Sequence, residues 1–210
     1  ISKKYYARFY NGTIHGYNKK IHDDIKTISM NSIGEIAPYS IMEGEKFNEK
    51  KFILIYDKNN NPVGMNCFFD WKFKDKIITH LGLYLIDEKH KGHNLQKIIA
   101  YLNLIHSISE YRFRIIWTDT GRSPSAWKAL DKNKIVKYCY PSLEKKFDEK
   151  FVNFSKDISK VFFRDYYKEC AISDNSIFDE NSFCIKNANN EGGFKKLIEF
   201  LGLISCIFLI

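Results

Sequence analysis

The segment that most constrains the fold of this chain is a short basic loop between an apolar stretch and a helical pattern. Residues 81–86 are mainly apolar and are typical of a β-strand. The loop that follows contains Gly92 among lysines and histidines. The first amides of a helix lack intrahelical partners and carry partial positive charge, so strand, loop and helix together predict an anion site, most simply for a pyrophosphate. The helical pattern comes from apolar residues three or four apart: Leu95, Ile98, Ile99 and Leu102.

Other phosphate-binding loops do not fit this segment. A P-loop needs Gly-Lys-Ser/Thr at the start of its helix, whereas Gly92 is followed by His93 and Asn94. A Rossmann fingerprint needs three glycines near the first strand, and here only Gly92 is present. A surface turn with solvated lysines is the simpler alternative, and the loop by itself leaves that alternative open.

The flanking segments add further elements in a fixed order. Residues 52–57 and 63–69 are rich in β-formers and are separated by an Asn/Pro turn, which predicts a hairpin. Residues 77–86 form the strand that leads into the loop, and residues 113–118 form a further strand after the helix. A short helix is then expected to begin at Ser123, which is followed by Pro124 at the first helical position.

This order resembles the core of the GNAT superfamily of acyl-CoA-dependent N-acyltransferases. The family loop commonly reads Val-x-Pro-x-Tyr-Arg-Gly-x-Gly-x-Gly-x-x-Leu, and residues 86–99 are similar to it. Val63-Gly64 resembles the family's hairpin, and residues 123–126 resemble its Asn-x-x-Ala helix. The resemblance covers roughly residues 50–132. The matching loop positions are Ile86, Glu88, His90, Lys91, Gly92, Asn94, Gln96 and Ile99.

The resemblance implies an α/β fold with a mixed, splayed sheet, helices on both faces and a helical C-terminal extension. A GNAT-like domain is expected over residues 1–140, with an extension over 141–210 packed on it. The implied co-substrate is acetyl-CoA or another acyl-CoA, the acceptor is an amine, and no metal is expected. The expected CoA-binding residues are Leu85, Ile86, Lys91, Gly92, His93, Asn94, Leu95, Gln96, Lys97, Ser123 and Ser125.

Catalytic candidates lie on the strand before the loop, which in this family faces the pantetheine arm and the acceptor. His80 and Tyr84 are four residues apart, so regular alternation places them on one face of the strand. A histidine titrates near neutrality and can serve as a base or order a water that does. Ordinary packing is the alternative for both residues. By the same resemblance, residues 14–50 are the segment that selects the acceptor.

Several positions depart from the family pattern. Asn94 and Gln96 replace two loop glycines, and Leu130 stands where many members have a tyrosine acid. Asparagine tolerates left-handed geometry, so Asn94 is the milder change. These departures support a second hypothesis, in which the chain is a non-catalytic GNAT-like module that binds nucleic acid or an assembly partner. The retained lysine–glycine loop supports the enzyme.

Composition limits partners and compartment. The net charge is +8 and the pI is about 9.1, which favours CoA, nucleic acid or an acidic protein surface, although a Lys-, Asn- and Ile-rich coding bias would give the same charge. The 5 cysteines are widely spaced and contain no Cys-x-x-Cys pair, which predicts a reducing, cytoplasmic compartment.

The C-terminal third carries two further patterns. Residues 143–170 are amphipathic at helical spacing, which predicts a helix packed on its own domain or, alternatively, a homodimer or partner surface. Residues 200–210 are uncharged and mainly apolar. A membrane span needs about 20 such residues, so membrane insertion is not expected and a buried final strand is favoured over a truncated anchor.

Overall fold

The computed structural model describes residues 4–36, 47–112, 116–120, 138–140, 148–165 and 205–209. The chain divides into two compact units, which are described separately. The first comprises Ile1–Asp70 and Thr79–Arg112, and the second comprises Trp71–Ile78 and Phe113–Ile210. The expected domain boundary at residue 141 lies outside the described residues and stays a prediction.

The described residues of the first unit include four strands in the order β1-β2-β3-β4. β1 pairs antiparallel with β2, and β2 pairs antiparallel with β3, with a register shift at Ile55/Tyr56. A tight turn at residues 74–75 joins β3 to β4 as a hairpin. The elements in chain order are β1 (Tyr5–Asn11), α1 (Gly12–His15), α2 (Lys19–Ile33), β2 (Lys51–Asp57), β3 (Pro62–Phe73), β4 (Lys76–Ile86), the 3₁₀ turn η1 (Glu88–His90) and α5 (Leu95–Tyr111).

Local signals fix where these elements begin and end. The side chain of Asn18 caps α2 by accepting a hydrogen bond from the amide of Ile21 at 3.2 Å. α2 ends at Gly34, whose φ of 75° is left-handed and whose amide bonds the carbonyl of Met30. Asp57 closes the β2–β3 turn, because its Oδ1 accepts the amides of two turn residues at 2.8 and 2.9 Å.

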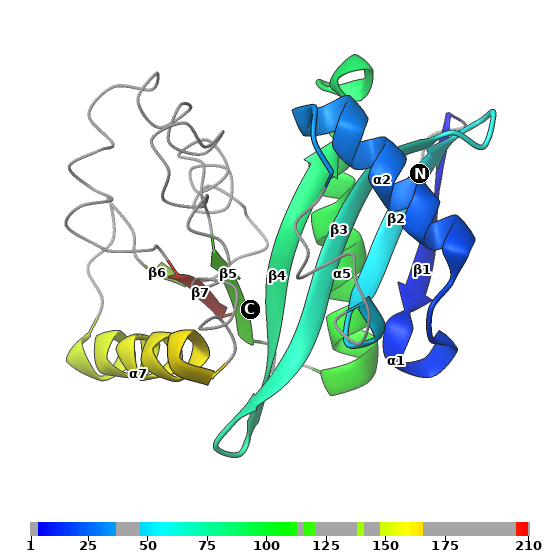
Figure 1. Ribbon diagram of the computed structural model, residues 1–210. Coiled ribbons are helices and arrows are strands. Elements are labelled where there is room, and N and C mark those ends of the chain that lie inside the picture. The colour runs from blue at the N-terminus through cyan, green and yellow to red at the C-terminus, as the bar shows by residue number, and fades with distance from the viewer. Residues whose placement is uncertain are drawn as a thin grey trace. The chain divides into compact units, whose positions relative to one another are not determined.

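The two long helices of this unit cover opposite faces of the sheet, as Figure 1 shows. α2 packs a row of isoleucines on one face, where they meet the inward side chains of β2, β3 and β4. α5 lies on the other face and buries Leu95 and Ile99. The core on the α2 face comprises Tyr10, Ile21, Ile25, Ile28, Phe47, Phe52, Leu54, Tyr56, Met65, Cys67 and Leu85.

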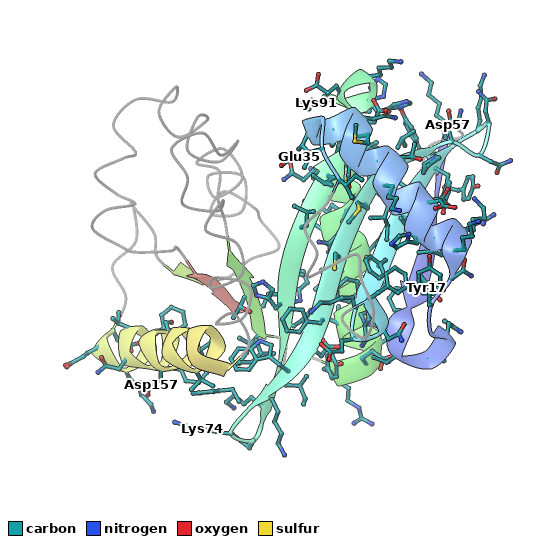
Figure 2. All side chains as sticks on the ribbon, in the orientation of Figure 1. Tyr17, Glu35, Asp57, Lys74, Lys91 and Asp157 are labelled. Carbon is teal, nitrogen blue, oxygen red and sulfur yellow. The ribbon has the colours of Figure 1, made fainter. Side chains whose placement is uncertain are left out.

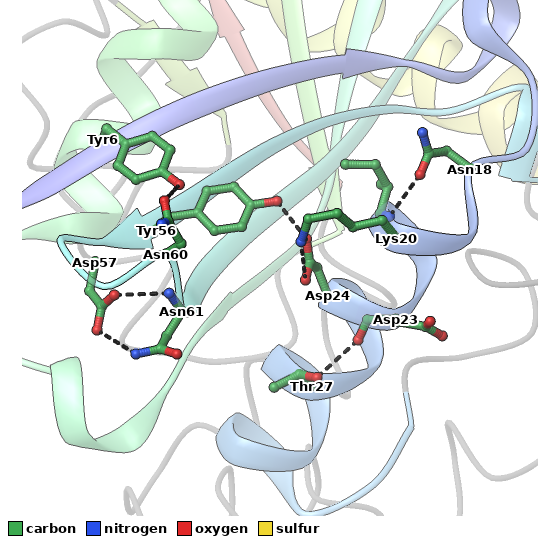
Figure 3. Close-up of polar contacts among 11 residues, drawn as sticks. Tyr6, Asn18, Lys20, Asp23, Asp24, Thr27, Tyr56, Asp57, Asn60 and Asn61 are labelled. Atoms are coloured by element: carbon green, nitrogen blue, oxygen red, sulfur yellow. Dashed lines mark hydrogen bonds and ion pairs between the residues drawn. The ribbon is translucent and has the colours of Figure 1, made fainter.

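A buried polar contact ties α2 to β2 (Figure 3). The hydroxyl of Tyr56 donates to Asp24 Oδ2 at 2.7 Å, and Lys20 Nζ bonds the same carboxylate at 3.0 and 3.2 Å. Burial, followed by the hydrogen bond to Asp24, raises the pKa of the Tyr56 phenol, which is therefore neutral and able to donate. Tyr6 stacks on Tyr56 with ring centroids 5.2 Å apart.

Beyond residue 112, the described residues of the second unit form three short strands and one helix. β5 (Ile116–Thr120) and β6 (Tyr138–Tyr140) both pair antiparallel with β7 (Ser205–Leu209), which lies between them. α7 spans Glu149–Asp165, inside the amphipathic segment 143–170. Within this unit, the ring centroid of Phe154 on α7 lies 6.0 Å from that of Phe73, near the tip of the β3–β4 hairpin. β7 confirms the final strand that the apolar residues 200–210 predicted.

The elements follow the order that the sequence predicted. The hairpin over residues 52–69, the strand that enters the basic loop and the helix that leaves it are all present. The α/β fold class is therefore confirmed. Among the described residues, no helix is long and apolar enough to cross a membrane. The short helix expected after Ser123 lies outside the described residues.

The Tyr56–Asp24 contact generates a prediction about stability. Tyr56→Phe should lower the free energy of unfolding by roughly 1–3 kcal/mol, because the buried carboxylate loses one of its donors. Tyr6→Phe is the matched control. Its hydroxyl donates to exposed Asn60 at 2.6 Å, so its loss should cost no more than about 0.5 kcal/mol. Urea denaturation of both variants makes the comparison, and equal costs would contradict the structural role of Asp24.

Candidate functional site

The basic loop begins at a buried aspartate that joins it to the rest of the first unit. Asp87, 6% exposed, caps η1 by accepting the amide of Lys89 at 2.9 Å. Its second oxygen accepts Asn31 Nδ2 from α2 at 2.9 Å. One residue on from Asn31 in α2, Ser32 Oγ donates to the carbonyl of Ile86 at 2.6 Å. The end of β4 and the start of the loop are therefore held by the C-terminal turn of α2.

The loop then turns through two residues with positive φ. Gly92 has φ 85° and Asn94 has φ 59°, both left-handed. An added Cβ at Gly92 would meet nothing within 4 Å, so glycine is favoured here by the positive φ and not by lack of space. Asn94 is the N-cap of α5, and its side chain makes no capping hydrogen bond to the described part of the chain. The amides of the first turn are thus left for another acceptor.

The two substituted glycines have different outcomes. Asn94 occupies a left-handed position, which asparagine tolerates, and the expectation that it is the milder change stays a prediction. Gln96 lies within the first turn of α5, where the backbone is helical, and its side chain is exposed. Neither replacement forces the backbone out of the strand–loop–helix path.

The lysines of the loop are on the surface. Lys91 Nζ pairs with Glu88 Oε1 at 2.6 Å, and both side chains are more than half exposed. An exposed pair of this kind contributes about 0–1 kcal/mol and is easily exchanged for another anion. Lys89 and Lys97 are also exposed. Lys91 and Asp57 lie at the same end of the first unit in Figure 2.

β1 brings a tyrosine to this end of the sheet. The Tyr5 hydroxyl lies 3.0 Å from His90 Nδ1 and also hydrogen-bonds His93 Nδ1. A cavity of about 280 Å³ opens beside it, lined by Lys4, Tyr5, Asp57, Lys58 and His90. Tyr5 was not among the predicted site residues. It is 85 residues from His90, and no local pattern reports a contact at that separation.

His80 is packed inside the sheet rather than placed to titrate. It is 4% exposed, and its ring lies 5.2 Å from that of Phe69. Lys50 Nζ covers the same Phe69 ring at 3.9 Å from its centroid. Burial, and then the charge of Lys50, lower the pKa of His80 to about 3. The expectation that His80 titrates near neutrality is therefore wrong.

Tyr84 lies on the α5 side of the sheet. Its hydroxyl oxygen accepts a hydrogen bond from Asn103 Nδ2 at 2.8 Å. Asn103, 1% exposed, also donates to Asn66 Oδ1 of β3 at 2.9 Å. Tyr84, Asn103 and Asn66 thus form a polar network between β3, β4 and α5.

His80 and Tyr84 do not share a face, which corrects the simple alternation rule. Thr79 donates to Asp70, and Asp70 also accepts from Tyr111 of α5, so Thr79 lies on the α5 face. Strict alternation would then put Tyr84 on the opposite face, yet it also meets α5. The alternation of β4 is therefore broken between residues 79 and 84, as a bulge would do.

The remaining predicted residues are distributed as follows. Leu95 and Leu85 are buried, at 2% and 5% exposure, so their side chains belong to the core and only their backbone could serve a ligand. Ser123 and Ser125 lie outside the described residues. Within the described ranges, no three His, Cys, Asp or Glu side chains are grouped to hold a metal ion.

Comparisons with known proteins find similarity in fold alone. No family model matches the chain, and no curated protein matches its sequence. A GNAT family N-acetyltransferase from Escherichia coli, solved with CoA, is 14% identical over 61% of this chain and 68% of that chain, with a TM-score of 0.47. One from Elizabethkingia anophelis, solved with acetyl-CoA, is 11% identical over 70% and 91%, with a TM-score of 0.45. An acetyltransferase from Trypanosoma brucei is 11% identical over 69% and 97%, with a TM-score of 0.46.

The left-handed backbone of Asn94 gives a test of the loop geometry. Asn94→Gly should leave the free energy of unfolding within about 0.5 kcal/mol of wild type, because glycine adopts this φ freely. Asn94→Val should cost about 1–2 kcal/mol, because a β-branched residue is strained there. Chemical denaturation of the two variants measures the difference. Equal stabilities would mean that residue 94 is not left-handed.

The lowered pKa of His80 predicts how the free energy of unfolding depends on pH. The folded pKa, about 3, lies below the ordinary histidine value of about 6.5, so the unfolded chain binds the proton more readily. The stability linked to His80 is therefore complete above pH 6.5 and is lost as pH falls toward 3. The slope of this loss is at most about 1.4 kcal/mol per pH unit.

His80→Gln should flatten the dependence of unfolding free energy on pH in that window, because glutamine does not titrate. His106, whose pKa is lowered mainly by burial, contributes to the same window in wild type and variant alike. The measurement is the difference between the two slopes from urea denaturation at a series of pH values. Parallel curves for wild type and His80→Gln would contradict a buried, neutral imidazole.

Proposed function

We propose that this protein is an acyl-CoA-dependent N-acyltransferase, with acetyl-CoA as the simplest donor and an amine as the acceptor. The observation that carries the proposal is the loop between β4 and α5. It combines left-handed Gly92 and Asn94, an α5 N-terminus with uncapped amides, and exposed lysines within a few residues. Such a loop suits the pyrophosphate of CoA.

In the proposed complex, the pyrophosphate accepts hydrogen bonds from the amides of residues 92–96. Lys91 and Lys97 supply positive charge, and Lys91 exchanges its surface partner Glu88 for a phosphate oxygen. His93, Asn94, Leu95 and Gln96 contribute through their backbone, which the left-handed turn brings close to the ligand. Ser123 and Ser125 are proposed to border the pantetheine arm, by resemblance to the family.

Acyl transfer forms a bond between the acceptor nitrogen and the thioester carbonyl carbon and breaks the carbon–sulfur bond. The nitrogen loses a proton and the sulfur gains one. His80, with a pKa of about 3, is neutral at pH 7 and too weak a base to remove the amine proton efficiently. The amine proton is proposed to leave through water.

Tyr84 is the proposed proton donor to the leaving thiolate. The amide of Asn103 donates to its oxygen at 2.8 Å, and this hydrogen bond stabilises the phenolate that remains after the proton has gone. Because His80 and Tyr84 lie on different faces of β4, a single group bound on one face meets only one of them. We therefore assign the proposed proton transfer to Tyr84 alone, in place of the expectation that both residues act side by side.

The acceptor is proposed to bind at the α1–α2 segment, the region that the family resemblance assigns to it. Large apolar side chains are exposed there, with Ile14 at 72% and Tyr17 at 57%. The acceptor amine could belong to a small molecule, a protein or a nucleic-acid component, and the net charge of +8 favours an acidic one. We also propose a homodimer through the 143–170 helix and a cytoplasmic location.

The test is direct titration with acetyl-CoA and CoA. Lys91→Glu should weaken the dissociation constant by roughly 1–3 kcal/mol, because it removes a charge-assisted contact and sets a second carboxylate beside Glu88. Lys19→Glu, at an exposed lysine in the first turn of α2, is the charge-matched control and should bind as wild type does. Isothermal titration calorimetry measures both.

Binding also has a stability readout. A ligand at about 100 times its dissociation constant should add about 2.7 kcal/mol to the free energy of unfolding. Failure of wild type to bind either CoA species would overturn the enzyme assignment and favour a non-catalytic module. Equal affinity of wild type and Lys91→Glu would remove Lys91 from the site.

A further inference from the structure

The middle of the β4–α5 loop contacts Tyr5, a residue of β1, which is the first unit's strand farthest from β4 in the strand order. The single hydroxyl of Tyr5 meets Nδ1 of His90 at 3.0 Å and Nδ1 of His93 as well. Both imidazoles also contact the Tyr5 ring, with centroids 5.7 and 5.8 Å away. Tyr5 sits in β1, which is paired to β2 along its whole length. The phenol is therefore attached to a regular element rather than to another loop.

Hydrogen-bond chemistry restricts the protonation of this cluster. A phenol has one proton and can donate it to only one of the two Nδ1 atoms. The other imidazole must carry a proton on its own Nδ1 and donate it to the phenol oxygen. Tyr5 thus fixes opposite roles for His90 and His93, and it fixes the orientation of both rings.

The position of the two histidines explains what such a contact would do. His90 ends η1, and His93 lies between Gly92 and Asn94, the two residues with left-handed backbone. Glycine loses more conformational freedom than other residues when its backbone is ordered. The Asp87 contacts hold the strand side of the loop, and buried Leu95 holds the helix side. Between them, the Tyr5 hydroxyl ties the segment to β1, whereas the Lys91–Glu88 pair joins residues within the loop.

We propose that Tyr5 is a positioning residue for the CoA-binding loop, and that it acts through His90 and His93 rather than by touching the ligand. This proposal rests on the proposed function of the loop. A loop that is already held in its binding conformation loses less conformational entropy when the ligand binds. The Tyr5 contact with His90 and His93 therefore raises CoA affinity although Tyr5 does not touch the ligand. It should change the binding step and leave the chemical step unaltered.

The test is Tyr5→Phe, which removes the hydroxyl and keeps the aromatic ring. The dissociation constant for CoA should rise about three- to tenfold, the effect of losing one or two modest hydrogen bonds that preorganise a site. In steady-state kinetics, KM for acetyl-CoA should rise by the same factor while kcat is unchanged. Tyr6→Phe is the control, because its hydroxyl bonds Asn60 and not the loop histidines.

Two further measurements separate positioning from a general loss of structure. Long-range ¹H–¹⁵N spectra of the imidazoles should show changed tautomer signals for His90 and His93 in Tyr5→Phe, with His15 unchanged as an exposed reference. In a double-mutant cycle, adding Tyr5→Phe to His93→Ala should weaken CoA binding less than Tyr5→Phe does alone.

The outcomes distinguish this proposal from the proposed function. If wild type binds CoA and Tyr5→Phe binds it equally well, the loop site stands and the positioning role of Tyr5 is overturned. That role is also overturned if the His90 and His93 signals do not respond to Tyr5→Phe. If wild type does not bind CoA, the proposed function fails, and the role of Tyr5 toward CoA fails with it.

Discussion

Asp87, whose carboxylate is buried, joins three elements that would otherwise end separately. Its backbone amide donates to the carbonyl of Val63 in β3, one side-chain oxygen caps η1, and the other accepts a hydrogen bond from Asn31 of α2. A carboxylate at 6% exposure is costly unless its oxygens are hydrogen-bonded, so this arrangement is self-consistent only when all three elements are in place. The direction in which the chain leaves β4, and therefore the position of the basic loop, depends on it.

The elements themselves could be predicted because their signals are local. Apolar spacing located α5, the Asn/Pro turn located the β2–β3 hairpin, and Gly92 located the loop turn. The faces of β4 could not be predicted in the same way, because alternation assumes a regular strand. Between Thr79 and Tyr84 the regularity fails, and Gly82 marks the place, since a Cβ there would lie 2.8 Å from the carbonyl oxygen of Cys67. Glycine within a strand was the available signal.

Burial decides the chemistry of the strand residues more than their identity does. Histidine is a common catalytic base because its ordinary pKa is near neutrality. Burial of His80 in the sheet, and then the positive charge of Lys50, lower its pKa to about 3. Tyr84 and Asn103 instead form a hydrogen-bonded network under α5. Neither environment has a sequence signature, because each is made by residues from different elements. Composition and motif identify candidates, and packing assigns them their protonation states.

The contact of Tyr5 with His90 and His93 spans 85 and 88 residues of chain. Helix α5 and the hairpins can form early, since their contacts are local, whereas a contact of this length carries a large loop-closure entropy and forms slowly. β1 is synthesised before the loop, so Tyr5 can make this contact only after residues near position 93 have been added to the chain. The β4–α5 loop should therefore reach its final conformation late in folding. Full affinity for the ligand would then indicate that β1 has paired with the rest of the sheet.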